Sequence, residues 1–249
     1  MALRYHVDEL PPVGRTRLSK ELSHHLTVVL RMREGSEFAL FDGRGGEALA
    51  RIVQASRTAL VEITSAIQHV APRDATIELA FSRPPEARLA QVFEHATELG
   101  VRRFRPVVFE RSKRAAHANV ARWTRIVSAA AGQCGALFVP TIDEPVPFSA
   151  LALEADGGPS PVLVAERDDA WPGRSVYARE LGAHVGTAAS VLIVVGPEAG
   201  FTDAEREALI HADTIAVAVG PYVLRVETAA LAVAALVRAF TSGTKERNA

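Results

Sequence analysis

Two short turns that combine glycine, proline and charged residues have the composition of a ligand-binding site. The first, "GPEAG" at residues 196–200, follows the apolar run "SVLIVV" at 190–195. The second, "GPYVLR" at residues 220–225, follows the similar run "TIAVAV" at 214–219. Glycine lets a ligand approach the main chain, and proline stiffens the turn that receives it. Ligands of parallel sheets bind at the carboxyl ends of strands, so we expect the two turns to grip one ligand from neighbouring strands.

Charged residues lie beside both turns, which favours a binding site over two turns that merely end strands. Glu198 belongs to the first turn, Arg225 ends the second, and Glu227 follows two residues later. Neither turn is a nucleotide phosphate loop, because GxGxxG is absent after the early strands and GxxxxGK[ST] is absent altogether. A nucleotide-dependent oxidoreductase is therefore a distant alternative.

The elements that must position these turns form an α/β domain after a β-rich segment. Residues 36–42, 47–54 and 58–64 are predicted strands, preceded by a helix over residues 22–35 that ends at Gly35. The composition changes near residues 68–76, which predicts domains at 1–72 and 73–249. Strands are then expected at 76–82, 104–110, 161–166, 190–195 and 214–219, and helices at 86–100, 119–133 and 226–240. Thr202 and Glu205 predict a capping box at the start of a further helix.

Bulk properties favour a soluble cytoplasmic protein. The chain has 249 residues, its amino end lacks the apolar core of a signal peptide, and its longest apolar run is too short for a membrane span. The single cysteine, Cys134, excludes an intramolecular disulfide and a multi-cysteine metal site, and no metal is expected. Net charge is −1, yet residues 101–125 carry about +7, which is the footprint either of a phosphate-binding face or of an arginine-rich composition.

The two turns, read with their surroundings, resemble a known signature. "VVGPEAGFTDAE" and "VAVGPYVLRVETAALAVAAL" are similar to the motifs of the SPOUT class of RNA methyltransferases, and within it to the ribosomal small subunit methyltransferase E family. "HHLTVVLRMREGSEFALFDGRGG" looks like that family's small amino-terminal RNA-binding barrel, which is PUA-like. "ATELGVRRFRPVVFERS" and "RWTRIVSAAAGQCGALFVP" look like its central segments, so the likeness covers nearly the whole chain.

The resemblance implies a deep trefoil knot, a homodimer and S-adenosylmethionine as cofactor. It implies methyl transfer to N3 of a specific uridine in 16S rRNA of the small ribosomal subunit. By position in the matched motifs, the cofactor site would comprise Gly196, Pro197, Glu198, Gly200, Val219, Gly220, Pro221, Leu224, Arg225, Glu227 and Thr228.

For such a reaction the charged residues beside the turns acquire roles. Loss of the N3 proton spreads negative charge over the base oxygens, which a fixed guanidinium would stabilise, so Arg225 is the first catalytic candidate. Glu227 would orient Arg225 or accept the proton, and Glu198 is a weaker candidate for the same task. The target base must be unpaired or flipped out, and basic residues would hold the backbone around it. The RNA-binding candidates are Arg31, Arg33, Arg102, Arg103, Arg111, Lys113 and Arg114.

The sequence departs from the family pattern at several positions. Ala199 replaces a usual glycine, Tyr222 replaces a usual arginine, and Ala136 and Phe138 stand where arginines are common. Fewer cations weaken a phosphate grip, so the cofactor site is better preserved than the substrate site. Two alternatives therefore stay open: a SPOUT paralogue that methylates a different RNA, and a non-catalytic RNA-binding protein whose knot is structural.

Overall fold

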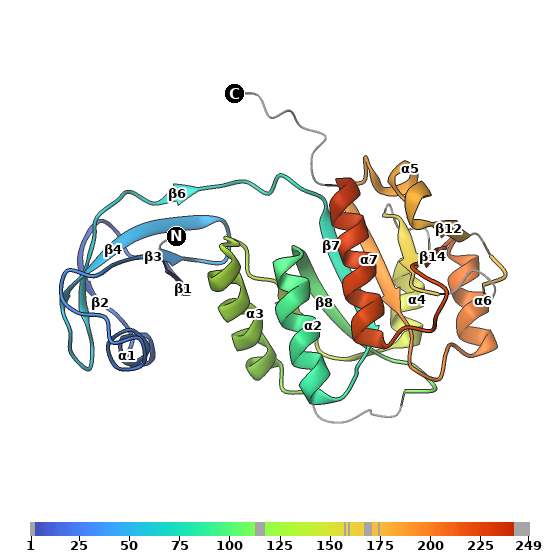
Figure 1. The fold of residues 1–249 in the computed structure, drawn as a ribbon, viewed down its shortest axis with the longest axis horizontal. Coiled ribbons are helices and arrows are strands. Elements are labelled where there is room, and N and C mark those ends of the chain that lie inside the picture. The colour runs from blue at the N-terminus through green and yellow to red at the C-terminus, as the bar shows by residue number, and fades with distance from the viewer. Residues whose placement is uncertain are drawn as a thin grey trace. The chain divides into compact units, whose positions relative to one another are not determined.

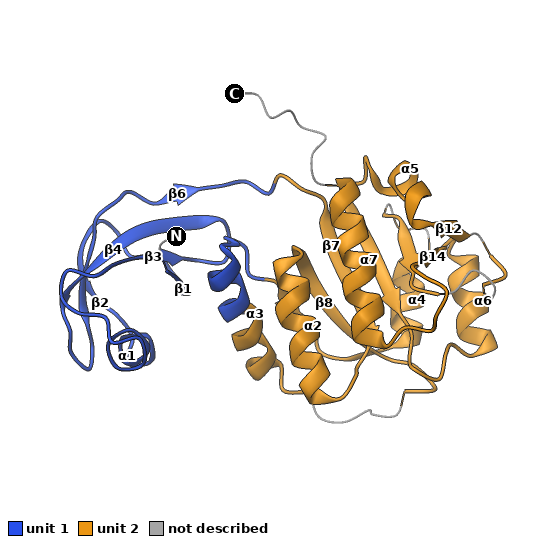
Figure 2. Ribbon diagram, in the orientation of Figure 1, with its two compact units in different colours: residues 1–72, 128–139 blue, residues 73–127, 140–249 orange. Residues whose placement is uncertain are grey.

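The computed structural model describes residues 3–112, 118–156, 158, 160–166, 171–173 and 175–241. The chain divides into two compact units (Figure 2). Unit 1 comprises Met1–Pro72 and Ser128–Val139, and unit 2 comprises Arg73–Val127 and Pro140–Ala249. Residues 128–139, which the sequence analysis placed in the α/β domain, thus pack with the β-rich segment. Lys113 and Arg114 lie outside the described residues.

Unit 1 is built on a sheet in the order β1-β3-β4-β5-β2, with β6 paired to β4. Its strands are β1 (Arg4–His6), β2 (Gly14–Arg17), β3 (Glu37–Phe41), β4 (Gly46–Gln54), β5 (Leu60–Ile63) and β6 (Gln68–His69). The expected strands correspond to β3, β4 and β5, whereas β1, β2 and β6 were not expected because they are too short to show alternation. Phe38, Leu40 and Ile52 project into the core of this unit, where Leu26 meets them.

The helical segment of unit 1 is shorter than predicted. The α-helix α1 (Lys20–His24) continues as the π-helical turn η1 (His25–Val29), so the helix ends at Val29 and not at Gly35. Arg31 has a φ of 54°, a left-handed conformation that stops helix propagation. Gly35, with a φ of 87°, instead forms the turn that leads into β3.

Unit 2 is a parallel α/β sheet in the order β10-β8-β7-β13-β11-β14-β12, with β9 paired to β8. Its strands are β7 (Thr76–Ser82), β8 (Val101–Val108), β9 (Thr141–Ile142), β10 (Val146–Pro147), β11 (Val162–Val164), β12 (Ser175–Tyr177), β13 (Ser190–Val195) and β14 (Ile215–Ala218). Its helices are α2 (Glu86–Glu98), α4 (Phe148–Ala155), α5 (Gly182–Val185), α6 (Asp203–His211), α7 (Val226–Thr241) and the short η3 (Ala178–Glu180). The helix α3 (Val120–Cys134) begins in unit 2, and its residues from Ser128 onward belong to unit 1. α2 and α7 pack together, and α7 covers β7 and β13, while α4 packs on β8 and α6 (Figure 1).

The two glycine turns do not follow neighbouring strands, which corrects the expectation from the sequence. β11 lies between β13 and β14 and is parallel to both, with Leu163 opposite Ile193 on one side and Ile215 on the other. The apolar run of β11 can pair equally well with any of the buried strands, so strand order cannot be read from composition. The ligand site predicted at two strand ends must therefore include a third.

The predicted capping box at α6 is confirmed. The Thr202 hydroxyl accepts a hydrogen bond from the Glu205 amide at 3.2 Å, and the Glu205 carboxylate accepts one from the Thr202 amide at 2.8 Å. The other oxygen of Glu205 accepts a hydrogen bond from the Glu110 amide at 2.9 Å. This buried carboxylate therefore fastens the segment after β13 to the segment after β8.

Replacing Thr202 by alanine should lower the free energy of unfolding by about 1 kcal/mol, because the first turn of α6 loses its side-chain acceptor. Urea denaturation followed by circular dichroism measures the change. Thr202→Ser is the matched control, since it keeps the hydroxyl oxygen, and it should lose much less. Equal stability of the alanine variant and the parent would show that the cap contributes nothing.

Among the described residues, no helix is both long enough and apolar enough to span a membrane.

Candidate functional site

The carboxyl ends of β11, β13 and β14 surround one cavity, which we call the strand-end cavity. It holds about 710 Å³ of empty space, part of which is continuous with solvent. Both glycine turns line it, as required for a shared ligand site. The lining residues predicted from the sequence are Gly196, Pro197, Glu198, Gly200, Val219, Gly220 and Leu224. Of the other predicted residues, Pro221, Arg225, Glu227 and Thr228 are not part of this lining.

The glycines of the strand-end cavity differ in their surroundings and backbone conformation. A Cβ at Gly196 would lie 2.6 Å from the Phe201 ring, so only glycine lets the turn pack on that side chain. Gly200 has a φ of 74° and donates its amide to the Pro197 carbonyl at 2.8 Å, which closes the first turn. A Cβ at Gly220 would meet nothing within 4 Å, so this glycine faces open space.

Several lining residues escaped the sequence analysis. Ala165 and Glu166 extend from the end of β11, and Phe201, Tyr222 and Val223 also line the cavity. The sequence did contain an indication that Glu166 lies at the site, because this carboxylate ends the predicted strand at 161–166. Tyr222 and Val223 are 79% and 75% exposed, which places two large apolar side chains at the rim of the cavity.

A second cavity, the arginine cleft, adjoins the first and has a volume of about 530 Å³. It shares Pro197, Glu198, Val223, Leu224 and Val226 with the strand-end cavity, so these residues form a common wall. The remainder of its lining is Ser82, Arg83, Pro84, Pro85, Arg88, Arg111, Ala199 and Arg225. Arg225 and Arg111, which were singled out from the sequence for different roles, thus line the same cleft.

Arg88 connects the two carboxylates that the sequence analysis had assigned to catalysis. Its guanidinium contacts Glu198 at 3.3 Å and Glu227 at 3.4 Å. The Glu227 side chain is 13% exposed, and its Oε2 is buried and accepts no hydrogen bond from any described residue. Arg88 therefore joins the first glycine turn to the beginning of α7, a role that the sequence did not indicate.

Arg111 and Arg225 differ in how they are held. The Arg111 guanidinium donates to the carbonyls of Ala199 and Phe201 at 3.4 and 3.1 Å, which fastens it to the first glycine turn. Arg225 is exposed, and its guanidinium forms no hydrogen bond or ion pair with a residue that the structure describes. Arg225 is thus a cation available to a ligand in the cleft.

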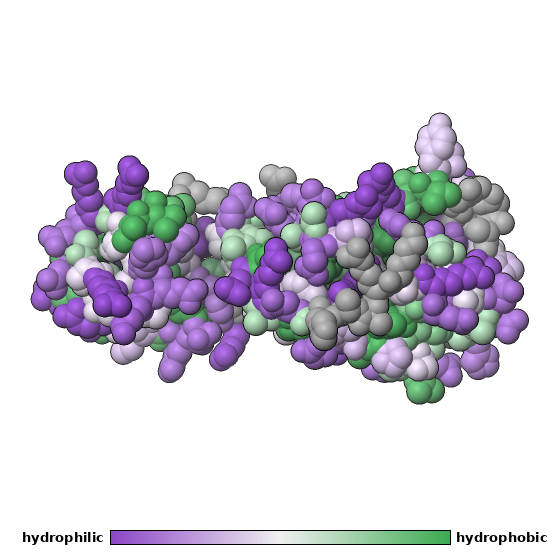
Figure 3. Space-filling view, turned by 90° about the horizontal axis from the view of Figure 1, so that it is seen from below, coloured by the Kyte–Doolittle hydropathy of each residue, from purple (hydrophilic) through white to green (hydrophobic). Residues whose placement is uncertain are grey.

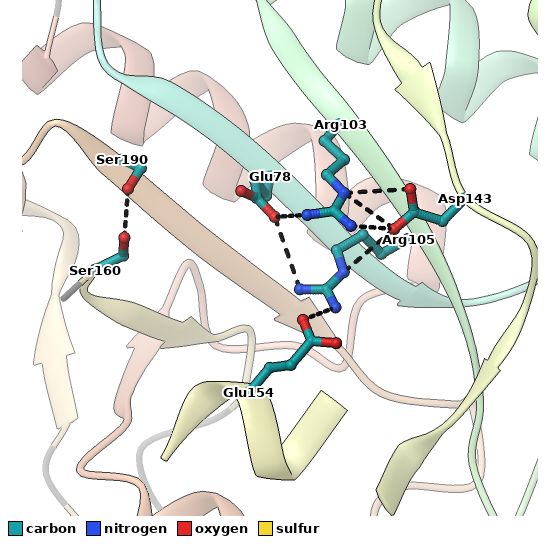
Figure 4. A network of polar contacts seen from close by, with 7 residues as sticks. All are labelled: Glu78, Arg103, Arg105, Asp143, Glu154, Ser160 and Ser190. Carbon is teal, nitrogen blue, oxygen red and sulfur yellow. Dashed lines mark hydrogen bonds and ion pairs between the residues drawn. The ribbon is translucent and has the colours of Figure 1, made fainter. Parts of the chain in front are cut away.

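The remaining predicted RNA contacts fall into different environments. Arg103 lies in an ionic network with Arg105, Glu78, Asp143 and Glu154, and its Nη2 is 2.9 Å from Asp143 Oδ2 (Figure 4). The hydrogen bond to Asp143 raises the pKa of the Arg103 guanidinium, while burial and then the charge of Arg238 lower the pKa of Arg102. Arg103 therefore contributes to ion pairing within unit 2. Arg31 and Arg33 are exposed in unit 1.

The face at the carboxyl ends of the unit 2 strands mixes hydrophilic side chains with apolar patches (Figure 3). No group of three or more His, Cys, Asp or Glu side chains suited to a metal occurs within the described ranges. The strand-end cavity and the arginine cleft therefore provide apolar surface, main-chain groups and guanidinium groups to a ligand.

The parallel sheet, with its glycine turns around one cavity at the strand ends, defines an α/β protein with a candidate ligand site at the carboxyl ends of its strands. The family model described as "RNA methyltransferase domain" matches residues 71–238, and the model "RNA methyltransferase PUA domain" matches residues 18–64. The chain belongs to this RNA methyltransferase family.

Relatives and solved structures agree with this assignment. The chain is 27% identical to the ribosomal RNA small subunit methyltransferase E of Bacillus subtilis over 92% of this chain and 90% of that protein. It is 29% identical, with a TM-score of 0.82, to a crystal structure of the Neisseria gonorrhoeae methyltransferase E bound to S-adenosyl methionine, covering 96% and 98% of the two chains. A methyltransferase from Legionella pneumophila, solved with the bound cofactor SAM, gives 26% identity and a TM-score of 0.84 at the same coverages. The predicted family and fold class are confirmed, while the knot stays a prediction.

Proposed function

We propose that this protein uses S-adenosylmethionine to methylate N3 of a uridine in 16S rRNA of the small ribosomal subunit. The observation that carries the proposal is the strand-end cavity, where two glycine turns that follow different strands line one space. Relatives named ribosomal RNA small subunit methyltransferase E and two similar structures with the bound cofactor support the same activity.

The lining of the strand-end cavity fits such a cofactor. Gly220 leaves open space where a side chain would stand, and Gly196 and Gly200 keep the facing turn compact, so a ligand can approach the main chain from both sides. Glu198 and Glu166 add carboxylates that suit a ligand with positive charge. When bound, S-adenosylmethionine supplies an activated methyl group together with its leaving group. Pro221, Arg225, Glu227 and Thr228 would act from outside the immediate lining.

The arginine cleft contains the residues that would act on the base. The exposed Arg225 guanidinium would stabilise the negative charge that develops on the uracil oxygens as N3 loses its proton. Glu227 would accept that proton, directly or through water, and Glu198 is the second candidate for this role. The contact by which Glu227 was expected to orient Arg225 is not formed, because Glu227 contacts Arg88 instead. Arg88 holds both carboxylates, so it would fix their positions relative to the cofactor turn.

The finer expectations belong to the same proposal. We infer a homodimer, because Leu231, Leu236 and Phe240 of α7 stay partly accessible although the helix is strongly apolar. We also infer a trefoil knot around the second glycine turn and a cytoplasmic location beside the ribosomal subunit. Sedimentation equilibrium of the purified protein measures the oligomeric state directly.

Mapping of modified uridines in rRNA from a strain that lacks the gene tests the proposed substrate. One N3-methyluridine of the 16S rRNA should disappear and should return when the gene is restored. If every normal N3-methyluridine persists but another RNA loses a methyl group, the paralogue alternative is correct. If the purified protein binds RNA but no S-adenosylmethionine, the non-catalytic alternative is correct.

A further inference from the structure

We propose that the arginine cleft binds the phosphodiester backbone of a single-stranded RNA segment next to the nucleotide that is modified. This inference rests on the proposed function and specifies how its substrate is held. We assign Arg83 and Arg111 as the residues that contact phosphate groups of this RNA segment.

The Arg83 and Arg111 guanidinium groups are fixed before any ligand binds. The Arg83 guanidinium carbon lies 5.2 Å from the centre of the Trp123 ring, and Trp123 is 1% exposed. Arg111 is held by the carbonyls of Ala199 and Phe201. The cation–π contact orients the Arg83 guanidinium. The two carbonyl contacts orient Arg111 and leave other N–H groups of its guanidinium able to donate. A phosphate that binds there loses less free energy to side-chain ordering.

The cleft is positively charged overall. Arg83, Arg88, Arg111 and Arg225 line it, and within the described lining the only carboxylate is that of Glu198. Even when Glu227, which contacts Arg88, is counted, guanidinium groups exceed carboxylates. Pro84, Pro85 and Pro197 also line the cleft, and their restricted backbone stiffens its walls. An anion is therefore the complementary ligand, and a planar guanidinium fork matches phosphate geometry.

Size and continuity favour a nucleic acid strand over a free anion. The cleft has a cavity volume of about 530 Å³, which exceeds what one phosphate needs and lies in the range of small-ligand sites. The common wall with the strand-end cavity would bring a base held in the cleft up to the methyl donor. Because N3 is hidden in a base pair, the strand that enters must be unpaired or locally opened.

The test is the salt dependence of RNA binding by Arg83→Gln and Arg111→Gln, measured by fluorescence anisotropy with a labelled single-stranded 16S rRNA fragment. Each variant should weaken binding at low salt and reduce the slope of log K against log salt by about 0.7, the value for one phosphate contact on a single strand. Arg179→Gln is the matched control: it removes one exposed guanidinium, its side chain is 78% exposed, and it does not line the cleft. The control should keep the parent slope.

Calorimetric titration with S-adenosylmethionine reports whether each variant is correctly folded. If Arg111→Gln disturbs the first glycine turn and weakens cofactor binding, the salt dependence of Arg83→Gln alone tests the phosphate assignment. The inference is wrong if Arg83→Gln binds the cofactor normally and keeps the parent slope. Methylation by the parent protein is measured separately, so failure of the cleft assignment is distinguishable from failure of the proposed function. An equal loss in Arg179→Gln would also contradict the assignment, because it would show that binding follows net charge alone.

Discussion

The variant Gly220→Trp should bind S-adenosylmethionine at least about 100-fold more weakly than the parent, a loss of about 2.7 kcal/mol. Gly220 lines the strand-end cavity, and a Cβ there would meet no atom within 4 Å. There is room for an indole at this position, and because Gly220 lines the cavity we expect the indole to obstruct it without displacing the surrounding chain. Isothermal titration calorimetry measures the affinity, and thermal unfolding checks that the fold persists.

Two further glycine variants make this result specific. Gly220→Ala adds a single methyl group to open space and should keep most of the affinity. Gly196→Ala should instead reduce the melting temperature, because its Cβ would lie 2.6 Å from the Phe201 ring. Normal cofactor binding by a folded Gly220→Trp variant would rule out the strand-end cavity as the cofactor site.

Arg225→Met should lower kcat by about 10²–10³ at saturating RNA, which is the usual cost of removing one group that stabilises transition-state charge. The guanidinium is exposed in the arginine cleft and has no partner among the described residues, so its charge is available to the base. The Kd for S-adenosylmethionine should stay close to that of the parent, since Arg225 is not part of the lining of the strand-end cavity. Single-turnover transfer of a labelled methyl group to RNA measures the rate.

Arg225→Lys separates charge from shape, because lysine keeps the cation but loses the planar fork. Its rate should lie between those of the parent and the methionine variant. Arg179→Met, which removes a guanidinium from outside both cavities, should keep the parent kcat. A kcat for Arg225→Met within about threefold of the parent would exclude Arg225 from the charge-stabilising role.

Local patterns predicted much of the fold. Buried β-branched runs such as "SVLIVV" are typical of strands in a parallel sheet that is covered on both faces, so β13 was recognisable without any tertiary information. The capping box of Thr202 and Glu205 was recognisable for the same reason, since its partners are three residues apart. The short strands β1 and β2 were missed, because three or four residues that pair with distant strands leave no periodic signal.

Strand order and long-range ion pairs were beyond the reach of local patterns. The position of β11 between β13 and β14 depends on pairing energies that apolar residues supply with little specificity. Arg88 looked like an ordinary charged residue on a helix, and only the fold brings it to Glu198, 110 positions away. Glu166 carried a terminal-carboxylate signal, but its relevance depended on the same unpredicted strand order.

Ligands bound in the strand-end cavity and the arginine cleft would be thermodynamically coupled through the wall that the two spaces share. Glu198 and Leu224 face both spaces, so a ligand that shifts them on one side changes the surface presented on the other. Linkage then requires reciprocity: the factor by which the methyl donor changes RNA affinity equals the factor by which RNA changes donor affinity. After transfer, the demethylated cofactor and the modified strand would still share that wall, and the departure of either would alter the hold on the other.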